Sequence, residues 1–218
     1  MERKLLITGC PRAGTLFAAN VWRRAGLDFG HEHCRGDGSV SWFFAVDDDS
    51  YPDLPWKNPK GRCAHVGERR SDYEFANVWH QVRDPLKCIT SMSLVVSREQ
   101  WAWAARHIVL PDLKGDVRRL ALVHWVKWNA LCAERASWTY RVEDFEQHWP
   151  RMLLKLGMRP RPIPSVRKDT HRSLRWSKPF VDREAIKKMP DLTWDELYAI
   201  DERFAELAAK AAKEYGYV

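Results

Sequence analysis

Residues 9–15 combine the residue types that bind an anion, in the order that an anion site needs. Their sequence is GCPRAGT, and they follow the apolar run LLIT at residues 5–8. A buried strand that turns at a glycine and leads into a helix points several backbone N–H groups at one place, together with the positive end of the helix dipole. Arg12 adds a planar guanidinium, and Thr15 adds a hydroxyl. We therefore expect a phosphate-binding loop.

The glycine spacing in this loop matches that of the ATP and GTP phosphate loop, G-x-x-x-x-G-K-[ST]. No lysine follows Gly14, because Thr15 comes directly after it, and the cation lies inside the loop at Arg12. The loop therefore predicts a phosphorylated nucleotide without ordinary ATP chemistry. The alternative is a tight strand-to-helix turn with an exposed arginine.

A second motif occupies residues 80–85, with the sequence HQVRDP, and Ser91 follows eight residues after Arg83. It lies where a predicted strand ends and a predicted helix begins, with proline suited to the first turn of that helix. Arg83 and Ser91 could bind a second phosphate. The alternative is an Arg–Asp pair at the surface and an exposed helix serine.

Together the two motifs resemble those of the sulfotransferase family that uses 3′-phosphoadenosine 5′-phosphosulfate. The family's P-[KR]-[SA]-G-T loop matches residues 11–15, and its R-D-P motif with a serine eight residues after the arginine matches Arg83 and Ser91. Ala13 is a departure, because many members have serine there. The ending EYGY at residues 214–217 is similar to that of bacterial members. The resemblance implies that the 5′-phosphosulfate is held by Pro11, Arg12, Ala13, Gly14 and Thr15.

The resemblance also implies that Arg83 and Ser91 hold the 3′-phosphate, and that the fold is a P-loop-like three-layer α/β sandwich. By analogy with phosphoryl transfer, sulfuryl transfer needs positioning, charge relief on the leaving phosphate and deprotonation of the acceptor. We expect Arg12 and the loop amides to supply the electrostatic part, with no metal. The acceptor would be a hydroxyl or amine of a small molecule or saccharide.

The acceptor's proton needs a base within hydrogen-bond reach, and the run GHEH at residues 30–33 offers candidates. Glu32 is the first choice and His31 the second, and a position near Arg12 would keep Glu32 ionised but also make it less basic. The alternatives are a solvated loop, or a metal site with Cys34. His80 is another candidate base, although a histidine within a strand is more often packed.

Two further features bear on the cofactor and the acceptor. Residues 167–178 are basic. The resemblance implies that a late basic segment closes over the 3′-phosphate and adenine, which Arg172 or Lys178 could do here, the alternative being a solvated loop. Trp101 and Trp103 could line an acceptor pocket, but core packing is favoured. Asp84 is interpreted as an N-terminal helix residue.

Strands and helices alternate along the chain, which predicts an α/β fold with a largely parallel sheet. Ligands of such folds bind at the carboxyl ends of the strands, so the segments after residues 8, 82 and 142 should share one edge. Strands are predicted at residues 4–8, 63–66, 77–82 and 138–142. Helices are predicted at residues 14–25, 40–46, 85–96, 116–136, 143–156 (divided by Pro150) and 193–214, with residues 28–39, 47–62 and 158–180 irregular.

Composition limits the classes further. A chain of 218 residues with 45% hydrophobic residues predicts one domain, 1–218, with a sizeable core. The net charge is +7, but no nucleic-acid-binding motif is present, so an anionic cofactor is favoured over a polynucleotide. Five cysteines without C-x-x-C pairs, no leader and no long apolar run indicate a soluble cytoplasmic protein. The rival functions are a small-molecule kinase with a degenerate loop, and a non-enzymatic module that binds nucleotides or nucleic acid.

Overall fold

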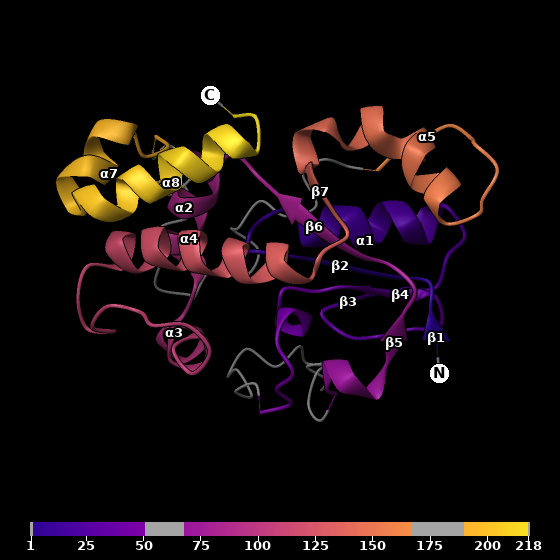
Figure 1. Cartoon of the computed structure of the whole chain (residues 1–218), viewed down its shortest axis with the longest axis horizontal. Helices are drawn as coiled ribbons and strands as arrows, with labels where there is room; N and C mark the ends of the chain where they lie inside the picture. Colours follow the sequence, from indigo (N-terminus) through magenta and orange to yellow (C-terminus); the bar gives the residue numbers. More distant parts are fainter. Residues whose placement is uncertain (1, 51–67, 167–189, 218) are drawn as a thin grey trace.

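A five-stranded parallel sheet forms the centre of the computed structural model, which describes residues 2–50, 68–166 and 190–217 (Figure 1). The α/β prediction and its largely parallel sheet are therefore confirmed. A separate parallel pair joins β1 (Glu2–Arg3) to β5 (Glu74–Phe75). The strand order of the main sheet is β3 (Phe29–His31), β4 (Gly38–Val40), β2 (Leu5–Gly9), β6 (Val78–Val82) and β7 (Trp138–Arg141).

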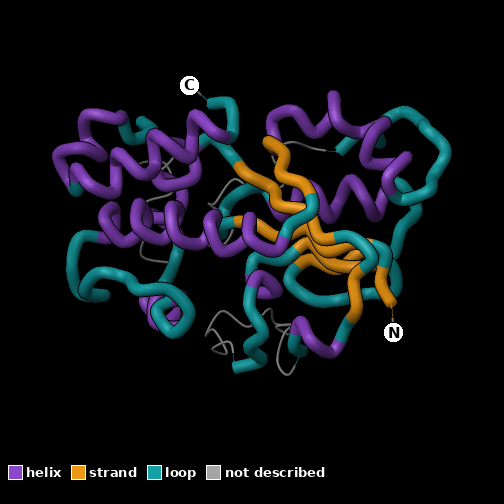
Figure 2. The backbone as a smooth tube through the Cα atoms, viewed as in Figure 1, coloured by secondary structure: helices purple, strands orange, loops and turns teal. Residues whose placement is uncertain are grey.

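Helices flank the sheet (Figure 2). The buried apolar residues form two cores. One core contains α1 (Thr15–Arg24) and α5 (Phe145–Lys155). The other contains α2 (Pro85–Val95), α3 (Arg98–Ala104), α4 (Val117–Arg135), α7 (Trp194–Ile200) and α8 (Glu202–Glu214). Short 3-10 turns occur at η1 (Phe43–Ala45), η2 (Arg70–Asp72) and η3 (Val142–Asp144).

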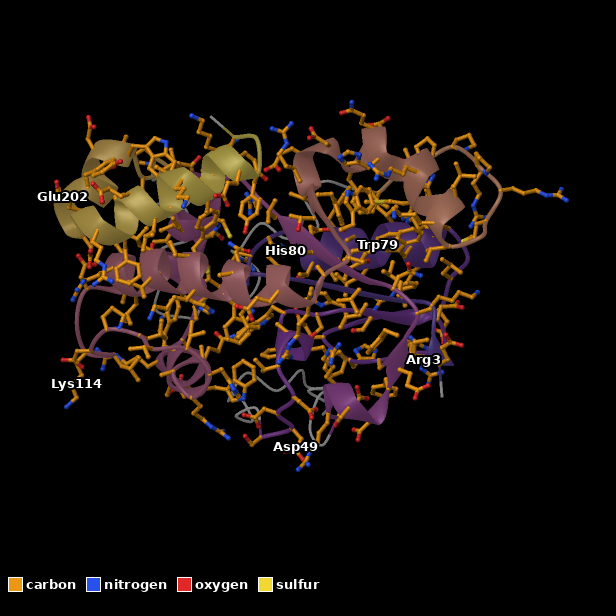
Figure 3. All side chains as sticks on the ribbon, viewed as in Figure 1. Arg3, Asp49, Trp79, His80, Lys114 and Glu202 are labelled. Carbon is orange, nitrogen blue, oxygen red and sulfur yellow. The ribbon has the colours of Figure 1, made fainter. Side chains whose placement is uncertain are left out.

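Neighbouring residues of β6 show how the sheet separates these cores (Figure 3). The Trp79 ring packs in the α1–α5 core, with its centroid 6.3 Å from that of Trp22. The His80 ring lies on the opposite face of the sheet, where its Nε2 is 3.0 Å from Asn129 Oδ1 of α4. Because successive side chains of a strand point to opposite faces, covering both faces keeps the central strands buried.

The longest predicted helix is confirmed with small changes. Asp116 caps α4 by accepting from the Arg118 N–H at 2.8 Å. Leu120, His124 and Trp128 are buried as the helical spacing predicts. Val117, which the same spacing places on the buried face, is 44% exposed in the first turn.

Two strands were not predicted, because β3 and most of β4 lie in the run at residues 28–39, which was predicted to be irregular. They have three residues each, too few to show an alternating pattern. At Gly38 the sheet requires a residue without a side chain, because a Cβ there would lie 1.9 Å from the Leu5 carbonyl oxygen. The predicted helix at residues 40–46 is wrong apart from η1, since Val40 belongs to β4.

The prediction that Pro150 divides its helix is wrong. The α5 helix is continuous from Phe145 to Lys155 with Pro150 inside it. Pro150 is exposed, while Trp149 and Met152 anchor the helix in the core. Tertiary packing therefore outweighs the hydrogen bond that proline removes.

The single predicted C-terminal helix is two helices. Thr193 and Glu196 form the expected capping box, with the Glu196 N–H donating to Thr193 Oγ1 at 3.2 Å. The chain then leaves helical geometry at Asp201, whose side chain accepts from the Phe204 N–H and starts α8. The predicted strand 63–66 and loop residues 51–62 lie outside the described residues. None of the helices within the described ranges is long and apolar enough to cross a membrane.

Candidate functional site

A cavity of about 900 Å³ opens at the carboxyl ends of β2, β6 and β7. Its walls include the loop after β2, Arg83 after β6, and Val142 and Glu143 after β7. The prediction that these three segments share one edge of the sheet is thus confirmed.

In the loop after β2, every carbonyl oxygen from residue 10 to residue 14 accepts from a protein donor. The donors to these oxygens, in chain order, are Ala13 N (3.1 Å), Cys88 Sγ (3.4 Å), Arg83 Nη1 (3.0 Å), Gln81 Nε2 (2.7 Å) and Ala18 N (3.2 Å). Within the described ranges, no side chain caps α1 at Gly14. Helix starts carry N–H groups with no acceptor inside the helix, and here that start lines the cavity. The start of α1 can therefore offer backbone N–H groups to an anion in the cavity.

Two loop residues have left-handed backbones. Gly14 has a φ of 89°, and a Cβ there would lie 3.0 Å from Val142 Cγ2. Arg12 has a φ of 71°, which is uncommon for a residue other than glycine. Contacts on both sides hold Arg12 in place, because Arg83 binds its carbonyl oxygen and its own Nε donates to Ser91 Oγ at 3.0 Å.

The same contacts join the two sequence motifs. Arg12 and Ser91 are 79 residues apart in sequence, and Arg83 binds the Arg12 carbonyl. Burial, and then the nearby Arg83, lower the pKa of the Arg12 guanidinium. Two arginines in the wall of one cavity favour an anionic ligand there.

Glu32 and His31 reach the same cavity from the end of β3. Thr15 connects them to the loop, because its Oγ1 lies 3.1 Å from His31 Nε2 and donates to Glu32 Oε1 at 3.5 Å. The other oxygen of Glu32 accepts from Ser41 Oγ at 2.8 Å and from the Trp42 N–H at 3.2 Å. These hydrogen bonds fix the Glu32 carboxyl group beside the start of α1.

Glu32 differs from expectation in its charge. Burial raises its pKa to about 8, and the hydrogen bonds from Ser41 and Trp42, which lower the pKa, only partly oppose this. The side chain is 11% exposed. The expectation that Arg12 keeps this carboxyl ionised is therefore wrong, because desolvation of the carboxylate has the larger effect.

Several of the described candidates do not line the cavity. His80 is fully buried, its ring bonds Asn129, and burial lowers its pKa to about 4. Trp101 and Trp103 are 1% and 2% exposed, which confirms core packing. Asp84 caps α2 by accepting from the Lys87 N–H, as predicted for a helix start. Arg172 and Lys178 lie outside the described residues.

The alternative of a metal site at residues 31–34 finds no support in the described part of the chain. There, no group of three or more His, Cys, Asp or Glu side chains is placed to hold an ion. The His33 ring nitrogen Nδ1 instead lies 2.8 Å from the His31 carbonyl oxygen.

Sequence reasoning missed the residues that support the site from behind. Gln81 and Tyr140 lie within predicted strands, and Ser41 lies in a segment predicted to be helical. A buried polar residue in a strand beside a phosphate loop was the available signal for Gln81. No protein-family model, no curated protein and no solved structure matches this chain.

Proposed function

We propose that this chain is a sulfotransferase that moves a sulfuryl group from 3′-phosphoadenosine 5′-phosphosulfate to a hydroxyl or amine. The observation that carries the proposal is the junction of the two motifs at Arg12, whose side chain contacts Ser91 and whose carbonyl binds Arg83. One cavity thus offers two anion-binding groups, as a nucleotide with phosphates at both its 3′ and 5′ positions requires.

The residues present suit this donor. The loop at residues 11–15 would hold the 5′-phosphosulfate through N–H groups such as that of Gly14, whose peptide partner, the Ala13 carbonyl, accepts from the buried Gln81. Arg83 and Ser91 would hold the 3′-phosphate. Phe17, Val142 and Phe145 give the cavity an apolar wall against which a base can pack.

Glu32, with His31 second, would act as the base for the acceptor. In the transfer step the acceptor oxygen or nitrogen attacks sulfur, and the bond from sulfur to the 5′-phosphate oxygen breaks. The acceptor proton passes to the Glu32 carboxylate, and the products are the sulfated acceptor and 3′,5′-bisphosphoadenosine. Because only the ionised form can take the proton, turnover should rise with pH toward the pKa of about 8.

Substitution of Arg83 tests the donor site. Arg83→Ala should weaken 3′,5′-bisphosphoadenosine binding about 10- to 100-fold, because one charge-assisted contact is worth about 1.5–3 kcal/mol. Isothermal titration calorimetry measures the change. Arg118→Ala is the matched control, since Arg118 pairs with Asp116 at the start of α4. Equal affinity in wild type and Arg83→Ala would remove the assignment.

Substitution of Glu32 tests the base. Glu32→Gln keeps the shape of the side chain but cannot accept a proton, so turnover should be lost while bisphosphoadenosine affinity is kept. Product formation from the sulfate donor is the measurement. Normal turnover in this variant would move the base to another residue.

The rival functions differ in ligand. A kinase should be stabilised against heat by ATP with magnesium, and a nucleic-acid-binding module by an oligonucleotide with steep salt dependence. The proposed sulfotransferase should be stabilised most by bisphosphoadenosine. A thermal-shift comparison of the three ligands separates these functions.

A further inference from the structure

A buried side-chain amide lies directly beneath the anion-binding loop. Gln81 of β6 is completely buried, and its Nε2 donates to the Ala13 carbonyl oxygen at 2.7 Å. Its Oε1 accepts from the Tyr140 hydroxyl of β7 at 2.8 Å, and Tyr140 is only 3% exposed. The three groups form a chain that runs from the sheet to the loop.

The donor and acceptor atoms determine the direction of each hydrogen bond in this series. A carbonyl oxygen only accepts, so the NH₂ end of Gln81 must face Ala13 and its oxygen must face Tyr140. Burial raises the pKa of the Tyr140 phenol, which therefore stays a donor at any working pH. Buried polar chains in which each group has a partner hold one conformation.

The bond that Gln81 makes determines which way one peptide unit of the loop faces. The unit between Ala13 and Gly14 has its oxygen toward Gln81, which directs its N–H the opposite way. Gly14 is a glycine with a φ of 89°, so this unit can rotate with little steric resistance. Rotation would turn a carbonyl dipole toward the anion and remove a donor.

We propose that Gln81, oriented by Tyr140, is a positioning residue that holds the loop at residues 9–15 in its anion-binding form. Gln81 does this from the protein interior, unlike Arg83, which binds the neighbouring carbonyl and faces the cavity. The inference rests on the proposed function only for the choice of nucleotide probe, since the same loop should also hold inorganic pyrophosphate.

The first test replaces each member of the chain by a near-isosteric apolar residue. Gln81→Met should weaken binding of both bisphosphoadenosine and pyrophosphate about 10- to 100-fold. This is the loss seen in metal sites when a residue that orients a metal ligand is replaced. Tyr140→Phe removes only the hydroxyl and should weaken both about 3- to 10-fold, because the Gln81 amide is less firmly held. Calorimetry gives the affinities, and thermal unfolding gives the stabilities.

Asn129→Leu is the matched control. Asn129 is a buried amide on α4 that bonds His80 rather than the loop. It should lower stability as Gln81→Met does and leave both affinities unchanged. A merely structural role for Gln81 predicts instead that the two variants behave alike in binding.

The second test uses rescue by protonation. In Gln81→Glu, a protonated carboxyl can donate to the Ala13 oxygen and accept from Tyr140, whereas a carboxylate repels that oxygen. Pyrophosphate affinity of the variant, relative to wild type at each pH, should be near normal at low pH and fall as the introduced group ionises. Tyr140→Phe answers the question if this variant does not fold.

The outcomes separate the two proposals. Wild-type binding of bisphosphoadenosine with unchanged affinity in Gln81→Met and Tyr140→Phe would overturn the role of Gln81 and leave the sulfotransferase proposal standing. Wild-type binding of pyrophosphate alone, lost in Gln81→Met, would support Gln81 and overturn the proposed donor. Binding of neither ligand to the wild type would overturn both.

Discussion

Arg12 and Glu32 are the described residues other than glycine that have positive φ, at 71° and 60°. Such conformations cost on the order of 1 kcal/mol each and persist only where surrounding contacts impose them. Both residues line the same cavity, and Thr15, the last residue of the loop, contacts Glu32. Backbone strain and candidate chemistry therefore coincide, as they commonly do at active sites.

Glu32 should destabilise the folded protein at alkaline pH. Its pKa is about 8 when folded against 4.5 for an ordinary glutamate, so its contribution is fully present below pH 4.5 and is lost as pH rises to 8. Glu32→Gln removes this loss and should be more stable than wild type at pH 9, by on the order of 3 kcal/mol. Urea unfolding at pH 4.5 and pH 9 measures it; a difference that does not grow with pH would contradict the raised pKa.

The residues of short motifs can be predicted from the sequence, but the buried residues that hold them in place cannot. Arg12, Arg83 and Ser91 are found because local spacing and the parallel-sheet rule bring them together. Ser41, Gln81 and Tyr140 are missed because their hydrogen-bond partners are distant in sequence. A single polar residue in a strand pattern also does not reveal which group its side chain contacts. The pKa of Glu32 is also missed, because it depends on burial.

Pro150 tests how packing and propensity compete within one element. Pro150→Ala restores an N–H for the Glu146 carbonyl one turn earlier and relieves the ring contact there. Because Pro150 is exposed, little packing is lost, and the variant should be about 1–2 kcal/mol more stable after the unfolded-state entropy is counted. Gln147→Ala, an exposed change in the same helix, is the control in urea unfolding. Equal or lower stability of Pro150→Ala would show that the helix already accommodates the proline.

Elements with long periodic patterns are predictable, and short ones are not. The 19-residue α4 is found from its spacing, whereas the three-residue β3 and β4 are set by their neighbours. Gly38 illustrates this, because it is required by the nearness of Leu5 rather than by any strand propensity. The break at Asp201 likewise depends on a cap and on the bond from Arg119.

The whole molecule places two histidines in its helix-covered core. His124 lies among the rings of Trp42, Trp101 and Trp128, and within the described residues neither of its ring nitrogens has a hydrogen-bond partner. Burial lowers its pKa to about 3, and that of His80 to about 4. Both rings are therefore neutral in the folded protein at pH values above these pKa values.

Acid should consequently destabilise the fold through these groups. An unfolded histidine takes up a proton below pH 6.5, so the stabilisation is present above 6.5 and falls by about 1.4 kcal/mol per pH unit for each histidine. His124→Leu should lose less stability than wild type between pH 7.5 and pH 5.5. Glu32 has the opposite effect on stability from the histidines. Because Glu32 is present in both proteins, the comparison cancels its effect. Parallel curves in urea unfolding would show that His124 is not kept neutral by folding.

Two buried thiols belong to or contact the loop at residues 9–15. Cys88 donates to the Pro11 carbonyl and Cys10 to the Met92 sulfur, and both cysteines are fully buried. Alkylating reagents can therefore reach them only while the loop is open, whereas the half-buried Cys34 is accessible without such opening. An anion bound at the loop would slow the modification of Cys10 and Cys88 without touching them. The rate at which these two thiols are labelled would therefore measure how often this part of the protein opens.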